Sequence, residues 1–278
     1  MVKLWVLRGL SKGILTTKYP KASPTSEEIP SRSIPPTPGT TVNWADGERI
    51  CLTGAIEANG GTMKSGRISL GKCVYCRMCS TAGFTFENRG TDSERPLNTS
   101  AALQASFPVK STAAEEEFLK QLESKWKTFK KSFHILMLDV GSCNACNLEV
   151  LNLSNPYYDL QRLGIFFTNS PKHADALVVV GALNKAMVDV LKNTYELIPN
   201  PKLVISVGAC PISGGIFQKT ESFVSPVIDV IPVDVEIPGC PPSPIQILQG
   251  LLIAMGRLKP DNPTSNKNQP RQNEKVEN

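Results

Sequence analysis

The stretch KLVISVG (202–208) decides the fold of the C-terminal half, because a nearly continuous apolar run ends there at a glycine. Helical stretches separate it from three further short apolar runs, namely FHILMLDV (133–140), ALVVVG (176–181) and VIPVDV (230–235). Apolar strands that alternate with helices are typical of a mainly parallel sheet with helices on both faces. The sequence therefore predicts an α/β domain over residues 132–258.

Four cysteines stand just past three of these strands, in the segments LDVGSCNACNLEVL (138–151), VISVGACPISGGIF (204–217) and VDVEIPGCPPSP (233–244). In an open α/β sheet, ligands collect at the carboxyl ends of the strands. Nearby glycines allow tight turns and a close approach of the backbone. We therefore expect these cysteines to converge on one site, here called the C-terminal quartet: Cys143, Cys146, Cys210 and Cys240.

The other cysteines lie in the N-terminal half, three of them in GKCVYCRMCS (71–80) at C-x₂-C-x₂-C spacing. This spacing opens a bacterial-type iron–sulfur motif, but the expected fourth cysteine is absent, and none follows until Cys143. In two-cluster ferredoxins the fourth cysteine of each motif binds the other motif's cluster. The missing ligand is therefore sought upstream, in ICLTGAI (50–56).

That upstream segment resembles the Cys-Pro-Thr-Gly-Ala-Ile segment of bacterial ferredoxins, with Leu52 in place of the proline. The resemblance implies a small ferredoxin-like α+β domain over residues 41–91 that has kept one cluster and lost the other. Its four cysteines, here called the N-terminal quartet, would bind one [4Fe–4S] cluster: Cys51, Cys73, Cys76 and Cys79. A Cys₄ zinc site and a three-iron cluster are the alternatives.

Residues 134–258 closely resemble the small subunits of energy-converting [NiFe] hydrogenases of the membrane-bound, formate-hydrogenlyase type. This family is shared with the terminal-cluster subunit of complex I. The matching residues include Asp139, Gly141, the C-terminal quartet, Glu149, Asp159, Arg162, HADALVVVG (173–181), Ser213 to Gly215 and PGCPP (238–242). The resemblance implies a flavodoxin-like, mainly parallel sheet whose quartet binds a second [4Fe–4S] cluster.

Two features of the C-terminal quartet bear on the reaction. Cys143 and Cys146 are separated by two residues, as in hydrogenases, whereas they are adjacent in complex I. The resemblance thus implies a cluster beside the nickel–iron site of a large partner subunit, which would carry the catalytic metal. Glu149, three residues past Cys146, is a candidate proton relay, and the alternative is a surface or helix-capping glutamate.

The rest of the chain predicts flanking segments. Residues 1–24 form a basic amphipathic arm, which resembles the arm of ferredoxin-like subunits in complex I and membrane-bound hydrogenases. Residues 25–40 are a Pro-rich linker, 92–131 a linker and helix, and 259–278 a polar tail that we expect to be disordered. No run of eighteen apolar residues predicts a transmembrane helix. We therefore expect a peripheral protein at the cytoplasmic face of the cell membrane.

Composition narrows the function further. The net charge of +5 comes with no motif for a nucleic-acid partner. Eight cysteines in two sets of four favour metal over disulfides. The predicted function is electron transfer through two [4Fe–4S] clusters in a multisubunit [NiFe] hydrogenase, with membrane subunits and a ferredoxin or other iron–sulfur donor as partners. The alternatives are a complex I-like quinone-reducing module and an assembly protein with two structural zinc ions.

Overall fold

The computed structural model describes residues 36–59, 65–86, 104–107, 131–217, 220–224 and 226–258, together with residues 16 and 129. The predicted tail, all but one position of the predicted arm, and all but two positions of 113–131, where we expect the helix, lie outside the described residues.

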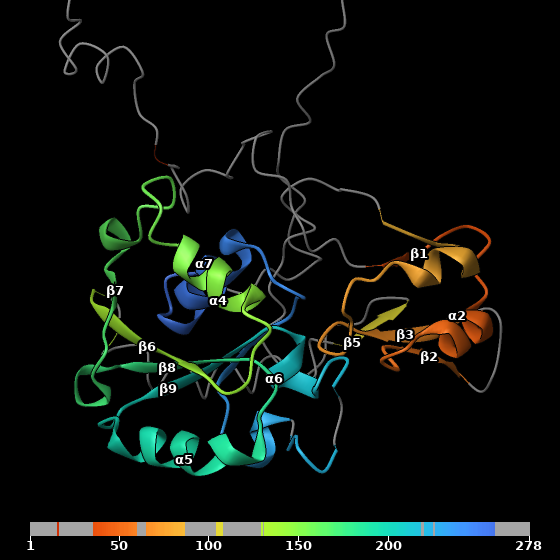
Figure 1. Ribbon diagram of the computed structural model, residues 1–278. Helices are drawn as coiled ribbons and strands as arrows, with labels where there is room; N and C mark the ends of the chain where they lie inside the picture. The colour runs from red at the N-terminus through yellow and green to blue at the C-terminus, as the bar shows by residue number, and fades with distance from the viewer. Residues whose placement is uncertain are drawn as a thin grey trace, which may run out of the picture.

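The C-terminal half is built on a parallel sheet, as the apolar runs predict (Figure 1). Its five strands lie in the order β10-β9-β8-β6-β7, and every neighbouring pair is parallel. The strands are β6 (Phe133–Asp139), β7 (Ile165–Phe167), β8 (Ala176–Val180), β9 (Leu203–Val207) and β10 (Val235–Ile237). β8 and β9 are buried at every position, which explains why their sequences do not alternate.

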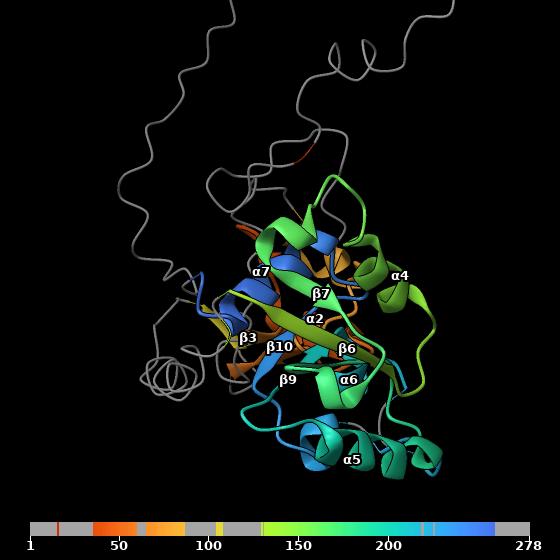
Figure 2. The same ribbon diagram turned by 90° about the vertical axis from the view of Figure 1, so that its left-hand side faces the viewer.

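Helices cover both faces of this sheet (Figures 1 and 2). One core lies under α4 (Ala145–Asn152) and α7 (Pro244–Ala254), and the opposite core lies under α5 (Val188–Leu197). α7 begins with a capping box in which Ser243 and Gln246 satisfy each other's backbone N–H groups. Short turns complete the domain: η4 (Leu160–Leu163), η5 (Pro171–His173), η6 (Lys185–Met187), α6 (Ala209–Ser213) and η7 (Val227–Asp229).

One strand begins later than its sequence predicts. The apolar run 230–235 becomes a strand only at Val235, because the Ile231 N–H bonds to the Val227 carbonyl at 3.1 Å and so continues the turn of η7. Pro232 has no N–H for a sheet ladder. The sheet therefore gains β10 only in the last residues before Cys240.

The N-terminal half contains two small antiparallel sheets. They are β2-β3-β5, from β2 (Ile56–Ala58), β3 (Gly66–Ser69) and β5 (Gln104–Phe107), and the pair β1 (Thr37–Pro38) and β4 (Phe84–Thr85). α2 (Trp44–Ile50) and η2 (Met78–Ala82) pack beside them, with the Trp44 ring edge-on to Phe84 at 5.1 Å between centroids. β1 lies in the predicted Pro-rich linker and β5 in the predicted segment 92–131, so both contribute strands to this half.

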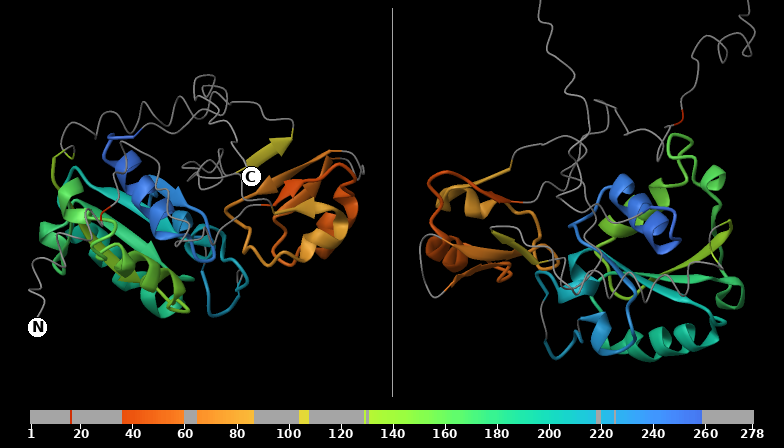
Figure 3. Two further views of the ribbon diagram at one scale, coloured as in Figure 1. Left: turned by 90° about the horizontal axis from the view of Figure 1, so that it is seen from above. Right: turned by 180° about the vertical axis from the view of Figure 1, so that it is seen from behind.

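The two halves touch at α6, on the side of the parallel sheet that faces the N-terminal sheets (Figures 1 and 3). Ile212 of α6 is buried in the same apolar cluster as Trp44, Ile68 and Phe84. The Ser213 hydroxyl donates a hydrogen bond to the Gly71 carbonyl at 2.9 Å. The core of the N-terminal half therefore includes a residue from the C-terminal half.

Candidate metal centres

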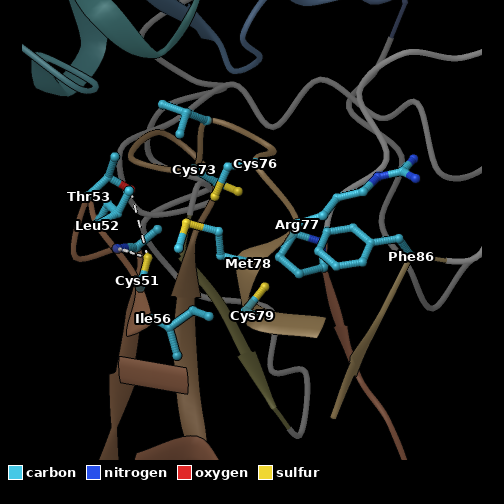
Figure 4. A pocket seen from close by; sticks show the side chains of 13 residues that line it. Cys51, Leu52, Thr53, Ile56, Cys73, Cys76, Arg77, Met78, Cys79 and Phe86 are labelled. Atoms are coloured by element: carbon cyan, nitrogen blue, oxygen red, sulfur yellow. Dashed lines mark hydrogen bonds between the residues drawn. The ribbon is translucent and has the colours of Figure 1, made fainter. Parts of the chain in front are cut away.

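The N-terminal quartet surrounds one pocket (Figure 4). Cys51 ends α2, with its N–H bonded to the Gly47 carbonyl, and Cys79 lies on η2. Cys73 and Cys76 occupy the loop between β3 and η2, where Tyr75 has a left-handed φ of 55°. This conformation turns the loop between Cys73 and Cys76, and the pocket places both beside Cys51, which is distant from them in the sequence.

The electrostatics of this quartet fit a group that binds thiolates. Burial raises the pKa of Cys73 to about 12 and that of Cys79 to about 11, and repulsion from Cys51 and Cys76 adds to both shifts. The thiols are therefore protonated at neutral pH until a cation compensates their charge, and metal binding would release protons. The Ala55 N–H donates to the Cys51 sulfur at 3.2 Å, as backbone amides do around bound clusters.

Strand ends bring the C-terminal quartet together. Cys143 and Cys146 follow β6, with Cys146 in the first turn of α4; Cys210 lies on α6 directly after β9, and Cys240 comes three residues after β10. Burial raises the pKa of Cys146 to about 12, with repulsion from the other three cysteines. It also raises the pKa of Cys210 to about 11. The charges of Cys143, Cys210 and Cys240 each contribute to the raised pKa of Cys146, which supports one common site for the four thiols.

Glycines leave room beside these sulfur atoms. A Cβ on Gly208 would lie 2.6 Å from the Cys146 sulfur, and one on Gly215 would lie 3.3 Å from the Cys210 sulfur. Gly208 also has a φ of +98°, which side-chain-bearing residues rarely adopt. The loops thus provide four soft thiol ligands and close backbone around them, and this donor set fits an iron–sulfur cluster.

Asp139 organises the loop that carries Cys143, a role that sequence reasoning did not assign. Its carboxylate accepts hydrogen bonds from the backbone N–H groups of Gly141 and Ser142 at 2.9 and 2.8 Å, and from the Asn147 amide at 2.7 Å. Burial alone would raise the pKa of Asp139, but these hydrogen bonds outweigh it and hold the pKa below its usual value. An Asp followed by Gly-Ser is the sequence signal of such a turn.

Glu149 is buried rather than exposed, with 8% of its surface accessible. It lies on α4 three residues after Cys146, and its charge contributes to the raised pKa of that thiol. The surface alternative for Glu149 is therefore wrong, whereas its role in proton transfer stays a prediction.

The two quartets adjoin each other. Repulsion from Cys76 of the N-terminal quartet contributes to the raised pKa of Cys240. Burial raises the pKa of the Tyr75 hydroxyl above its usual range, and both Cys73 and Cys240 add to that shift. Tyr75 therefore lies close to both sites, and the sequence spacing gave no sign of this.

All eight cysteines are free of disulfides. Within the part of the chain that the structure describes, no group of three or more His, Cys, Asp or Glu side chains is arranged to hold a single metal ion. In the same part, no helix is long and apolar enough to cross a bilayer.

The fold and the relatives of the chain define a class of protein, the iron–sulfur small subunits of hydrogenase-like and complex I-like oxidoreductases. Residues 143–254 match the family model for the NADH ubiquinone oxidoreductase 20 kDa subunit. The chain belongs to this family through its C-terminal half, and the members of the family are subunits of oxidoreductase complexes.

Individual relatives span both branches of the family. A probable membrane-bound hydrogenase subunit of Pyrococcus furiosus is 38% identical over 139 residues, which is 50% of this chain and 83% of the relative. An NADH-quinone oxidoreductase subunit of Citrifermentans bemidjiense is 45% identical over 107 residues, or 38% of this chain and 62% of the relative.

A solved structure also matches the chain. A chain of the membrane-bound sulfane sulfur reductase, an archaeal respiratory membrane complex, is 33% identical with a TM-score of 0.42. The match covers 49% of this chain and 75% of that one.

Proposed function

We propose that the protein transfers electrons between two [4Fe–4S] clusters within a membrane-associated multisubunit [NiFe] hydrogenase. One observation carries this proposal: all eight cysteines are free, four of them line one pocket, and the other four follow the ends of parallel strands. One cluster would be held by Cys51, Cys73, Cys76 and Cys79, and the other by Cys143, Cys146, Cys210 and Cys240.

The residues of the chain would bind, orient and shield these groups. When bound, a [4Fe–4S] cluster supplies one-electron redox chemistry. Cysteine thiolates would hold it, and the Ala55 N–H would stabilise the negative charge on the Cys51 sulfur. Leu52 and Met78 line the N-terminal pocket and would limit the access of water. The substrate would be converted on the partner subunit.

The finer fold assignments belong to the same proposal. Numbered along the chain, the five parallel strands have the order 2-1-3-4-5, which is the order in flavodoxin. We therefore infer a flavodoxin-like domain over residues 132–258. The small antiparallel sheets around the N-terminal quartet support a ferredoxin-like, one-cluster domain over residues 41–91.

We further propose a nickel–iron large subunit and membrane subunits as partners, with a ferredoxin or another iron–sulfur subunit as donor. The hydrogenase relative in Pyrococcus furiosus supports this assignment. The amphipathic arm at residues 1–24 would place the complex peripherally on the cytoplasmic face of the membrane.

The main alternative is a complex I-like module that passes electrons to quinone, favoured by the relatives named as NADH-quinone oxidoreductase subunits. The separation of Cys143 from Cys146 argues for the hydrogenase. The residue after Cys143, Asn144, adopts a left-handed φ of 71° and precedes α4, so the loop can present Cys143 while Cys146 sits on the helix. A zinc-binding assembly protein is the other alternative, and it predicts no labile sulfide.

The test is the metal content of the native complex, purified anaerobically through this chain. We expect about one nickel per complex and about eight iron atoms per chain, four for each cluster. Iron and sulfide without nickel would contradict the hydrogenase assignment and favour the quinone-reducing module. Zinc without iron or sulfide would contradict both.

A further inference from the structure

One short helix connects the two quartets physically. α6 carries Cys210 of the C-terminal quartet, Ile212 in the apolar core of the N-terminal half, and Ser213 in a hydrogen bond to Gly71. Gly71 lies two residues before Cys73 of the N-terminal quartet. The five residues of α6 therefore carry one cysteine of the C-terminal quartet and contact the half of the chain that holds the N-terminal quartet.

The helix is well suited to hold a fixed position. It follows β9 directly, and every residue of that strand is buried in the sheet. The Ser213 hydroxyl lies 3.0 Å from the Ala209 carbonyl and accepts the Gly215 N–H at 3.3 Å, while the Gly214 N–H bonds to the Cys210 carbonyl at 2.8 Å. Contacts on both sides thus set the direction of the Ser213 hydroxyl.

We propose that Ile212 and Ser213 of α6 act as a domain lock, which holds the N-terminal quartet at one fixed distance from the C-terminal quartet. Domains of one chain are expected to move relative to each other unless their interface is large and apolar. A functional site needs supporting residues that hold its groups in one geometry, and a pair of electron-transfer centres would need the same. This inference rests on the proposed function; Ile212 and Ser213 are positioning residues.

The test compares the native complex with two single variants, Ser213→Ala and Ile212→Ala. Two properties are measured in each. The first is hydrogen–deuterium exchange of the amides of residues 70–76. The loss of one hydrogen bond should speed this exchange about fivefold, and the loss of the buried isoleucine side chain roughly thirtyfold. The second is the magnetic interaction between the two reduced centres by electron paramagnetic resonance, which should weaken because dipolar coupling falls with the cube of distance.

Matched control variants separate the lock from general damage. Ser154→Ala removes a hydroxyl from the exposed turn after α4, and Ile228→Ala shortens an isoleucine of η7 that is 45% exposed. Both controls should leave the exchange and the magnetic interaction at wild-type values.

The outcomes distinguish a failure of the domain lock from a failure of the proposed electron-transfer function. Faster exchange and weaker magnetic interaction in both lock variants, with iron content unchanged, supports the lock. Unchanged exchange in both variants overturns the lock, and leaves the proposed function intact if the complex still holds about eight iron atoms. A wild-type complex without two clusters overturns the proposed function, while the exchange measurement still decides the lock on its own.

Discussion

At the scale of single residues, Glu236 carries a cost in stability that the function does not explain. It lies in the middle of β10, with 6% of its surface accessible, and among the described residues its Oε2 atom has no hydrogen-bond partner. Burial raises the pKa of Glu236 from 4.5 to about 7. Opposite it on β9, Ser206 also has a buried hydroxyl without a partner among the described residues. The parallel sheet therefore contains an unsatisfied polar pair beside the strand end that leads to Cys240.

We predict that Glu236→Gln stabilises the protein at high pH. Because the folded pKa lies above the unfolded value, the stability contributed by this group is fully present below pH 4.5 and is lost as the pH rises through about 7. The variant should gain up to about 3 kcal/mol near pH 8 and almost nothing near pH 4. Denaturant midpoints at the two pH values measure the difference. Glu221→Gln, an exposed matched change, should show no such dependence, and an equal effect of Glu236→Gln at both pH values would contradict the prediction.

Residue-scale features differ in how well the sequence predicts them. The cysteines could be identified because their spacing is typical of metal-binding and cluster-binding motifs. The glycines beside them indicate tight turns. Glu236 gave no signal, since a single glutamate in the run VDVEIP (233–238) does not reveal which face it occupies. Tyr75 gave no signal either, because Cys240, which contributes to the raised pKa of its hydroxyl, is distant in the sequence.

At the scale of secondary-structure elements, the turn from β9 to α6 packs against the Cys146 sulfur, so its shape affects whether the C-terminal quartet can bind a cluster. We predict that Gly208→Ala prevents cluster binding there, because the new Cβ would lie 2.6 Å from the Cys146 sulfur at a φ of +98°. Iron content should fall by about four atoms per chain. Gly54→Ala is the matched control, since Gly54 also has a positive φ, of +62°, but a Cβ added there would meet nothing within 4 Å. Full iron content in Gly208→Ala would refute this prediction.

Elements of the C-terminal half could be predicted because each buried strand is a continuous apolar run. The N-terminal half was harder. β1 has two residues, one of them Pro38, and exists only because it pairs with Phe84 and Thr85 of β4. β5 likewise is defined by its register with β3. Such strands depend on tertiary pairing, so the sequence indicated linkers in both places.

At the scale of the whole molecule, the contact between the halves could not be read from the sequence. Ser213 and Gly71 are 142 positions apart, and no periodicity links them. The sequence predicted two modules, each with its own ligand set, while the structure adds that Ile212 completes the core of the N-terminal half. The two candidate ligand sets therefore lie in different halves of the chain, and the two halves share packing.

This division predicts how the two centres respond to the loss of a ligand. Cys51→Ser should remove the cluster of the N-terminal quartet and leave the other, because serine oxygen is a poor ligand for iron–sulfur clusters and Cys51 belongs to only one quartet. Iron should fall by about four atoms per chain, and one of the two reduced electron paramagnetic resonance signals should disappear.

Cys240→Ser provides the reciprocal test, and it should remove the other signal. If Cys51→Ser left the iron content unchanged, Cys51 would not be the fourth ligand of the N-terminal quartet. If either variant lost all of its iron, the packing through α6 would make the centres interdependent in assembly, and the two ligand sets could not then be treated as separate sites.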